Sequence, residues 1–384
     1  MKEINCDAVI VGGGLIGSAT AIALSKLGCM VVVLEKKPIN KPKIIDVDYR
    51  TTAISEGTKQ FLEQLGIWSD IKFHCEPIKK IKVIDRKISN MLEFDNKRRN
   101  SYLGYIVKNT IILKSLYNRI KLNKKIKLIN NYNIQQINNL NTSIEVCGDG
   151  PNISAQIVIA ADGKNSFIKN MKKTTSFNKN YKKKALVAII EHTQSHNNTA
   201  YEFFYKNGPL AILPMKKEKN KNISSIVWTE KEEYLTTLCK VDEAFLKEVL
   251  NKNTSNLIGY ITKINSKQIF PLTAHLNTKF YDKKLIYVGD SAHSVHPIAG
   301  QGWNLGMRDV EKLYKLTQKY TSLGLQIGDS LFCREYHNNT YYDAYRLYQI
   351  TDKLDNIFLN QNTLFKFGRS SSLKFIQKNN RLKN

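Results

Sequence analysis

A glycine-rich turn near the N-terminus has residue types and spacing suited to holding a nucleotide cofactor. Residues 12–17 (GGGLIG) follow a β-branched apolar run, 8–11, which is typical of a buried parallel strand. The small and apolar residues 18–27 then predict a helix. A second buried strand is expected at 30–34, and it ends at Glu35. Together these segments make a complete βαβ dinucleotide fingerprint.

The glycines and the acid of this fingerprint have separate tasks. Gly12 allows a tight turn, Gly14 lets the backbone approach a pyrophosphate, and Gly17 lets the helix pack closely on the strand. The helix N-terminus offers unpaired N–H groups to the phosphates, and Glu35 would accept the ribose hydroxyls. We therefore predict dinucleotide binding, with a glycine-rich loop that binds no ligand as the alternative. The fingerprint alone serves both NAD and FAD.

Two later strands also end in residues that could contact a ligand. One buried strand ends in Asp162-Gly163, and a carboxylate in that place lies where doubly wound sheets bind ligands. An ordinary Asp-Gly turn is the alternative. Another buried strand ends at Asp290, and residues 300–304 (GQGWN) then open a helix whose N–H groups and dipole can hold an anion.

The remaining elements predict an α/β fold with two kinds of sheet. Alternating apolar runs between 185 and 270 indicate an antiparallel sheet, interrupted by a helical insertion at 232–251. Residues 103–120 read as a turn into an amphipathic helix. The Asn-rich stretch 124–141 predicts short antiparallel strands.

Around the strand end at Asp290 the chain resembles a known family, the FAD-dependent aromatic hydroxylases of the para-hydroxybenzoate hydroxylase fold. The resemblance is carried by residues 289–310, which read GDSAHSVHPIAGQGWNLGMRDV, and is narrower still toward the ubiquinone-biosynthesis hydroxylases UbiH, UbiF and VisC. Residues 208–214 (GPLAILP), 227–229 (VWT) and Thr351-Asp352 are similar to further motifs of that group. Correspondences extend from about residue 5 to 375, nearly the whole chain.

The resemblance implies a Rossmann-like FAD-binding domain with an inserted antiparallel-sheet substrate domain and C-terminal helices. The implied divisions are an FAD-binding domain at 1–75, 101–175 and 272–335, a substrate-binding β-sheet domain at 76–100 and 176–271, and a C-terminal helical segment at 336–384.

The resemblance also assigns residues to the cofactor FAD. It implies that the ADP half is held by Gly12, Gly14, Gly17 and Glu35, with Arg50 beside the cofactor, although Arg50 alone would read as an exposed loop residue. Asp290 would bond the ribityl–pyrophosphate region, and Asp162 with Gly163 would serve both FAD and NAD(P)H. The surroundings of the flavin ring would be Pro297, Gly300, Gln301, Gly302, Trp303 and Asn304.

The implied reaction is monooxygenation of the aromatic ring of a polyprenylated phenol in ubiquinone biosynthesis. NAD(P)H reduces FAD, O2 adds at flavin C4a, and the hydroperoxide transfers one oxygen atom to the ring. No catalytic side chain is assigned, and no metal is needed. His293 and His296 are interpreted as groups that stabilise the turn. The alternatives are a flavoprotein scaffold of a quinone-biosynthesis complex and another flavoenzyme of the same fold.

Four positions depart from the family pattern. Ala160 stands where relatives usually have glycine, and Lys169 replaces an arginine by a point charge. Lys108-Asn109-Thr110 stands where relatives usually show Glu-Asn-Arg. These changes affect the expected contacts to FAD and the reductant more than the fold.

Composition separates the possible partners. The 384 residues include 59 Lys+Arg and 33 Asp+Glu, a formal charge of +26, yet the positive clusters are dispersed and lack a nucleic-acid-binding signature. We expect no nucleic-acid partner, and we assign the charge either to a solvated surface or to docking on anionic lipid. The scattered cysteines and the lack of a transmembrane run favour a cytoplasmic protein. Peripheral contact with the inner face of the membrane, or with other ubiquinone-biosynthesis proteins, stays open.

Overall fold

A parallel sheet forms around the N-terminal fingerprint in the computed structural model, which describes residues 3–37, 48–85, 90–95, 101–254, 257–296 and 300–359. Its strands, in spatial order, are β17 (Tyr281–Asp282), β18 (Leu285–Tyr287), β11 (Asn152–Ala160), β1 (Glu3–Val11), β2 (Val31–Glu35) and β8 (Ile126–Asn130). Only β17 in this row runs antiparallel. Ala8, Val9 and Ile10 of β1 are fully buried, as a strand covered on both faces requires.

The Asn-rich stretch corrects one prediction. Its first strand, β8, pairs parallel with β2, whereas β9 (Ile134–Asn139) pairs antiparallel with β10 (Ile144–Gly148), which is itself antiparallel to β11. Local alternation predicts that a segment is a strand but carries no information on the direction of its partner. Here the preceding helix, α5 (Asn109–Leu122), returns the chain so that β8 extends the parallel sheet.

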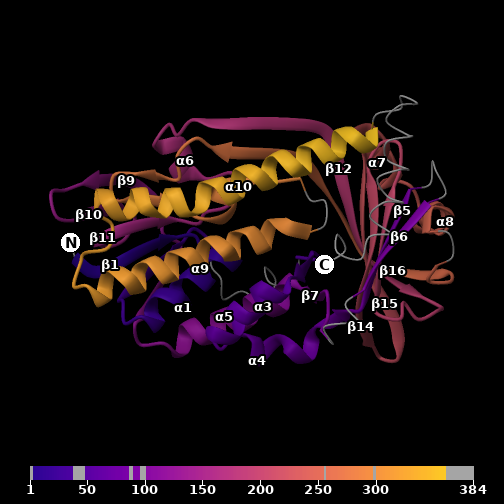
Figure 1. The fold of residues 1–384 in the computed structure, drawn as a ribbon, viewed down its shortest axis with the longest axis horizontal. Helices are drawn as coiled ribbons and strands as arrows, with labels where there is room; N and C mark the ends of the chain where they lie inside the picture. Colours follow the sequence, from indigo (N-terminus) through magenta and orange to yellow (C-terminus); the bar gives the residue numbers. More distant parts are fainter. Residues whose placement is uncertain are drawn as a thin grey trace.

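A small antiparallel sheet and several helices complete this lobe. The sheet has the order β3 (Thr51–Ile54), β7 (Gly104–Lys108), β4 (Glu76–Ile78), so residues expected to form a turn before α5 are strand β7. The helical elements are α1 (Leu15–Lys26), α3 (Glu56–Gln64), α4 (Trp68–Ile71), η1 (Lys72–His74), α6 (Phe167–Met171), η3 (Gly289–Ser291), α9 (Gln301–Ser322) and α10 (Ser330–Leu359). Helix α1 contacts both α5 and α9, and α9 contacts α10 (Figure 1).

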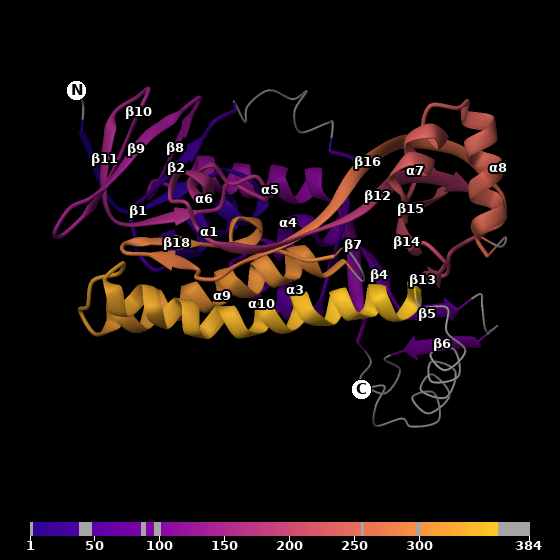
Figure 2. The ribbon, with the colours of Figure 1, turned by 90° about the horizontal axis from the view of Figure 1, so that it is seen from above.

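A second sheet forms the other lobe and is linked to the first by two long strands (Figure 2). Its order is β19 (His293–Ser294), β16 (Ile261–Asn277), β12 (Ser176–His192), β15 (Lys221–Lys231), β14 (Pro209–Glu218), β13 (Thr199–Phe204), β5 (Lys80–Asp85) and β6 (Asn90–Asp95). All neighbours pair antiparallel except β13 and β5, which are parallel. The predicted antiparallel sheet is therefore confirmed with one parallel pair.

The two faces of this second sheet pack against different parts of the molecule. We call the outer face the one that bears Leu186, Phe203 and Trp228, which pack with helices α7 (Glu232–Leu238) and α8 (Glu243–Thr254). The inner face bears Ile189 and Ala200, which pack with Ile78 and Ile106 of the small sheet. The inner face is thus turned toward the lobe with the dinucleotide fingerprint.

The C-terminal helix α10 begins at Ser330, before the expected segment boundary at 336. No helix in the described ranges is long and apolar enough to cross a membrane. Helix α10 crosses the lobe with the parallel sheet and extends toward the second sheet (Figure 2).

Asp352 joins α10 to strand β12. Its Oδ1 accepts hydrogen bonds from the Tyr181 hydroxyl, at 3.0 Å, and from Lys179 Nζ. We expect Asp352→Ala to lower the free energy of unfolding by about 1–3 kcal/mol, because both bonds involve a charged acceptor. Urea denaturation measures the change, and an unaltered midpoint would mean that apolar packing alone holds the helix end.

Candidate functional site

Four of the predicted site groups lie at one edge of the parallel sheet. Gly12, Glu35 and Asp162 follow or end the adjacent strands β1, β2 and β11, and Asp290 follows β18. These strands are parallel neighbours, so their carboxyl ends meet at the same edge. Ligands of open α/β sheets bind in the crevice outside this edge.

The glycine turn has the close contacts that the fingerprint requires. Gly12 has φ +104°, and a Cβ there would lie 2.5 Å from the carbonyl oxygen of Ala161. A Cβ on Gly17 would lie 1.9 Å from the carbonyl oxygen of Gly12. In contrast, a Cβ on Gly14 would meet no atom within 4 Å. Gly12 and Gly17 are therefore needed for packing, whereas Gly14 borders open space.

Two side chains from other elements hold the turn in place. Glu35 Oε2 accepts a 2.7 Å hydrogen bond from the Gly13 N–H, and the hydroxyl of Tyr117, in α5, donates to the Gly13 carbonyl at 2.6 Å. Tyr117 is buried. Sequence reasoning missed Tyr117, because nothing in its local pattern separates it from an ordinary core residue.

The start of α1 fits a phosphate group. Gly14 is the N-cap, no side chain caps the helix, and the first turn contains no acidic residue. The first N–H groups of the helix therefore point toward the space beside Gly14 with the positive end of the helix dipole. A pyrophosphate fits this open, uncapped helix end.

Asp290 lies close to three basic side chains. It is accessible to solvent, yet desolvation raises the pKa of its carboxyl, against the opposing charges of His293, Lys164 and Arg50. Lys164 Nζ donates to the Thr273 carbonyl at 2.7 Å. Lys164 was not predicted, although its place directly after Asp162-Gly163 is a usable signal.

Arg50 is held by a network that local sequence patterns do not reveal. Its Nε and Nη2 donate to the two carboxylate oxygens of Asp48 at 2.8 and 2.9 Å, and its guanidinium lies 5.5 Å from the ring centre of Phe270. Asn109 Nδ2 donates to Asp48 at 3.3 Å and Asn109 Oδ1 accepts from Thr52 at 2.6 Å. The departure at residues 108–110 thus keeps the asparagine that orients the Asp48–Arg50 pair.

Asp162 contributes one bonded and one unbonded oxygen. Its Oδ2 accepts from the Ile168 N–H at 3.1 Å, whereas its Oδ1 is buried and has no hydrogen-bond partner among the described residues. Burial is the main cause of the raised pKa of Asp162. Burial also lowers the pKa of Lys169, although the negative charge of Asp162 acts to raise it. Gly163 has φ +83°, with open space around it. The Asp-Gly turn therefore presents an unsatisfied acceptor beside the glycine turn.

The turn before α9 is fixed against strand β3. Gly300 is the N-cap of α9 with φ +61°, and a Cβ there would lie 3.3 Å from Ala53 Cβ. Asn304 Nδ2 donates to the Ala53 carbonyl at 2.8 Å, and its Oδ1 accepts from the Ser55 N–H at 3.0 Å. Asn304 is buried and its side-chain amide is bonded to the β3 segment, so the side chain fixes the turn whose N–H groups are expected to face the flavin.

The other residues of this turn differ in their surroundings. A Cβ on Gly302 would meet nothing within 4 Å. Trp303 packs on the main core, and its Nε1 is buried without a hydrogen-bond partner in the part of the chain that the structure describes. Gln301 begins α9. Pro297 lies outside the described residues.

The two histidines of the segment 289–310 contact other protein side chains. His293 Nε2 lies 2.6 Å from Asp309 Oδ2, and both side chains are 1% exposed. The ring of His296 packs edge-on against Tyr181 with 4.8 Å between the ring centres. Asp309, which orients His293, was not predicted as a site residue.

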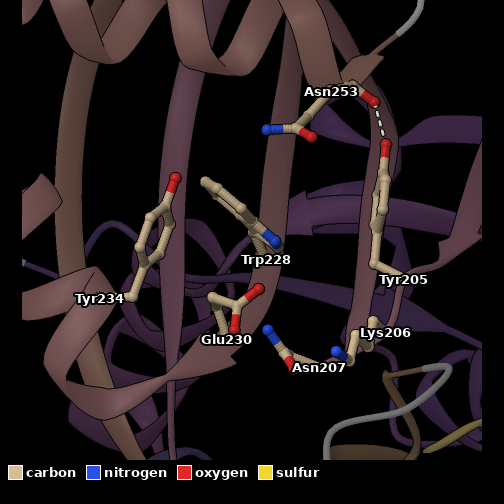
Figure 3. A pocket seen from close by; sticks show the side chains of 7 residues that line it. All are labelled: Tyr205, Lys206, Asn207, Trp228, Glu230, Tyr234 and Asn253. Atoms are coloured by element: carbon tan, nitrogen blue, oxygen red, sulfur yellow. Dashed lines mark hydrogen bonds between the residues drawn. The ribbon is translucent and has the colours of Figure 1, made fainter.

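A separate cavity of about 220 Å³ lies on the outer face of the second sheet (Figure 3). It is lined by Tyr205, Lys206, Asn207, Trp228, Glu230, Tyr234 and Asn253. Trp228 belongs to the motif at 227–229, yet its side chain faces this cavity and the helices α7 and α8. Trp228 therefore lies on the face of the second sheet that is turned away from the edge of the parallel sheet with Gly12, Glu35, Asp162 and Asp290. We call that edge the nucleotide edge.

The residues at the nucleotide edge fit a dinucleotide with two phosphates. The observations that decide this are the open space at Gly14, the uncapped α1 and the buried, unpartnered oxygen of Asp162. An additional polar group without a partner, Trp303 Nε1, lies in the turn expected beside the flavin.

Comparison with known proteins agrees with this geometry. Ubiquinone hydroxylase UbiL of Rhodospirillum rubrum is 29% identical over 355 residues, 92% of this chain and 82% of the relative. The 3-demethoxyubiquinol 3-hydroxylase of Escherichia coli is 27% identical over 373 residues, 96% of this chain and 90% of the relative.

A solved structure shares the fold at lower sequence identity. The p-nitrophenol 4-monooxygenase PnpA of Pseudomonas putida superposes with a TM-score of 0.80 at 16% identity, covering 100% of this chain and 96% of that one. The model of the FAD binding domain family matches residues 5–322. That match contains the glycine turn and all the strand ends described above, so the chain belongs to the FAD binding domain family.

Proposed function

We propose that this protein is an FAD-dependent monooxygenase that hydroxylates the aromatic ring of a polyprenylated phenol in ubiquinone biosynthesis. The reductant would be NAD(P)H, and the oxidant O2. One oxygen atom enters the ring and the other leaves as water, with two electrons from NAD(P)H and one proton from solvent. Two relatives named as ubiquinone-pathway hydroxylases align with more than nine tenths of the chain, and this observation carries the proposal.

The chain's own residues would bind and orient the cofactor. Bound FAD would supply the redox chemistry for the use of O2. The N–H groups at the start of α1 would hold the pyrophosphate, with Gly14 allowing close approach and Glu35 accepting the ribose hydroxyls. Asp162 and Asp290 would accept hydrogen bonds from hydroxyl groups of the cofactor, because both carboxyls lie at the same sheet edge.

The α9 end would stabilise negative charge on the flavin ring. A Cβ on Gly302 would meet no described atom within 4 Å, and the dipole of a 22-residue helix favours an anion at this end. Trp303 Nε1 would also find an acceptor there. Pro297 and Gln301 stay in the proposed flavin surroundings on the sequence alone.

We also propose the two-domain division stated above, with 176–271 and 76–100 as the substrate domain. The pairing of β5 with β13 and of β6 with β5 supports it, because these strands join the second sheet across a long chain separation. Strand β16 runs through the boundary at 271, so the domains share a continuous strand. The substrate would lie between the inner face of the second sheet and the turn before α9, which we call the flavin turn.

Purified protein provides the test of the reaction. FAD-loaded protein should oxidise NADH or NADPH faster when 2-farnesylphenol is added, and mass spectrometry should find a product heavier by one oxygen atom. If the protein binds FAD but forms no product that contains an additional oxygen atom, the enzymatic proposal is overturned and a scaffold is favoured. The ring position would be identified by the quinone precursor that accumulates in a strain without this gene.

A membrane contact would bring the enzyme to its substrate. Polyprenylated phenols partition into lipid, and the formal charge of +26 favours anionic headgroups. We propose peripheral binding on the cytoplasmic face of the membrane. Flotation should recover more protein with anionic than with neutral vesicles, and the difference should vanish at high salt. Equal recovery with both vesicles would leave the charge to a solvated surface.

A further inference from the structure

A carboxyl group interrupts an apolar row on the inner face of the second sheet. The register pairs Glu202 of β13 with Val83 of β5 on one side and with Ala211 of β14 on the other. The row continues through Val227 of β15 and Val187 of β12 to Gln268 of β16. Between its two ends, Glu202 is the one charged residue in this row.

Glu202 has no counter-charge to explain its position. Burial alone raises the pKa of its carboxyl to about 7, and no hydrogen bond or charged neighbour among the described residues contributes. The residue is nevertheless partly accessible to solvent. A desolvated carboxyl without a partner is unfavourable, and its accessibility leaves room for a ligand to supply the missing hydrogen bond.

The neighbouring rows show what this part of the sheet faces. In the row on one side, Ser225 Oγ accepts a 3.0 Å hydrogen bond from Thr51 Oγ1 of β3. In the row on the other side, Phe270 lies under the guanidinium of Arg50. The row of Glu202 runs between these two rows. Its member Val187 lies in β12 between Ile189, which pairs with Ser225, and Ala185, which pairs with Phe270.

The same segment of chain contacts the flavin turn. Residues 50–54 supply Thr51 and Arg50 to the inner face, and Ala53 accepts from Asn304 and touches Gly300. The inner face with Glu202 and the turn before α9 are therefore joined through one short segment. A ring held between them would have apolar contacts on most of its edge and one carboxyl within the apolar row.

We propose that Glu202 binds the hydroxyl group of the phenolic substrate and so fixes which edge of the ring faces the flavin. This inference rests on the proposed function. The phenol O–H would donate to the Glu202 carboxylate, and the apolar neighbours Val83, Ala211 and Val227 would contact the ring or the prenyl chain. No bond is broken in this step, so Glu202 is a substrate-binding residue with no oxidant or base required.

Binding of two matched probes to the FAD-loaded protein tests the inference without turnover. The probes are 2-farnesylphenol and its methyl ether, 2-farnesylanisole, in which a methyl group replaces the hydroxyl proton and removes the hydrogen-bond donor. Calorimetric titration at pH 8 should give wild-type protein about tenfold tighter binding of the phenol, the size of one hydrogen bond to a charged group. Glu202→Leu should bind both probes equally, with the affinity for the ether unchanged.

Two further variants separate the hydrogen bond from general effects on the sheet. Glu202→Gln keeps an acceptor oxygen and should retain a reduced preference for the phenol. Glu191→Leu removes a carboxyl of the same sheet that pairs with Lys221 at 2.7 Å, and it should keep the full preference.

The outcomes distinguish this inference from the proposed function. A tenfold preference that persists in Glu202→Leu, or that is absent in wild-type protein, would overturn the role of Glu202. If wild-type protein binds neither probe and shows no phenol-stimulated NAD(P)H oxidation, the substrate class itself is wrong. Oxidation that is stimulated equally in wild type and Glu202→Leu, with equal product yield per NAD(P)H, would leave the function standing and reject the inference.

Discussion

Gly14→Val should leave the protein folded and remove most of its FAD. A Cβ on Gly14 would meet no described atom within 4 Å, and its φ of −67° and ψ of −171° are accessible to valine. The added methyl groups would instead fill the space where the pyrophosphate approaches the first N–H groups of α1. We expect at least about tenfold weaker retention of FAD, equivalent to about 1.4 kcal/mol. Flavin absorbance of the protein after gel filtration measures the occupancy.

A second glycine provides the matched control for this variant. Gly57 lies in α3, and a Cβ there also meets no atom within 4 Å, but it belongs to no predicted cofactor contact. Gly57→Val should bind FAD as wild type does. The free energy of unfolding of apo Gly14→Val should stay within about 1 kcal/mol of wild type, since glycine is only a modest N-cap. Full FAD occupancy in Gly14→Val would show that the phosphates do not lie at this turn.

The nucleotide edge was predictable because its signals are local. The turn at 12–17 and the acids Glu35, Asp162 and Asp290 each stand at the end of a continuous apolar run. A buried parallel strand has a sequence pattern of its own, and the fold places all such strand ends at one edge. The prediction therefore needed no knowledge of which strands are neighbours.

The supports of this edge were not predictable in the same way. Tyr117 donates to Gly13 across 104 residues of chain, and Asn109, from α5, donates to the Asp48 carboxylate that binds Arg50. Such contacts depend on tertiary packing, which leaves no periodic trace in the sequence. The same reason explains why β8 was given the wrong pairing, since strand direction depends on the helix that precedes it.

The second sheet shows how alternation separates two functions. Trp228 and Glu202 both lie in strands of the expected substrate domain, but only the strand of Trp228 carries a family motif. Trp228 faces outward to the cavity below α7 and α8, while Glu202 is on the inner face. Sequence similarity pointed to the tryptophan, but strand parity, which only the register fixes, points to the carboxylate.

Asp309→Ala should cause the largest loss of stability among the variants considered. Asp309 Oδ2 accepts from the Gly289 N–H at 3.0 Å and lies 2.6 Å from His293 Nε2, with both side chains almost fully buried. Removal leaves a buried N–H and a buried imidazole without their acceptor, a change that costs about 3–5 kcal/mol. Gly289 directly precedes Asp290, so the variant should also lose FAD. Urea denaturation of the apo-protein separates the two effects.

Asp343→Ala and pH variation show whether the buried charge pair is responsible. Asp343 pairs with Arg308 and Lys312 at 34% exposure, so its loss should cost only about 0.2–1 kcal/mol. Burial opposes the charged form of His293, but the charge and hydrogen bond of Asp309 outweigh burial and raise its pKa. A raised folded-state pKa stabilises most below the unfolded value of about 6.5, and the contribution falls as pH rises through the folded value. The stability gap between wild type and Asp309→Ala should therefore be larger at about pH 6 than at about pH 9, whereas a constant gap would assign the loss to the Gly289 hydrogen bond alone.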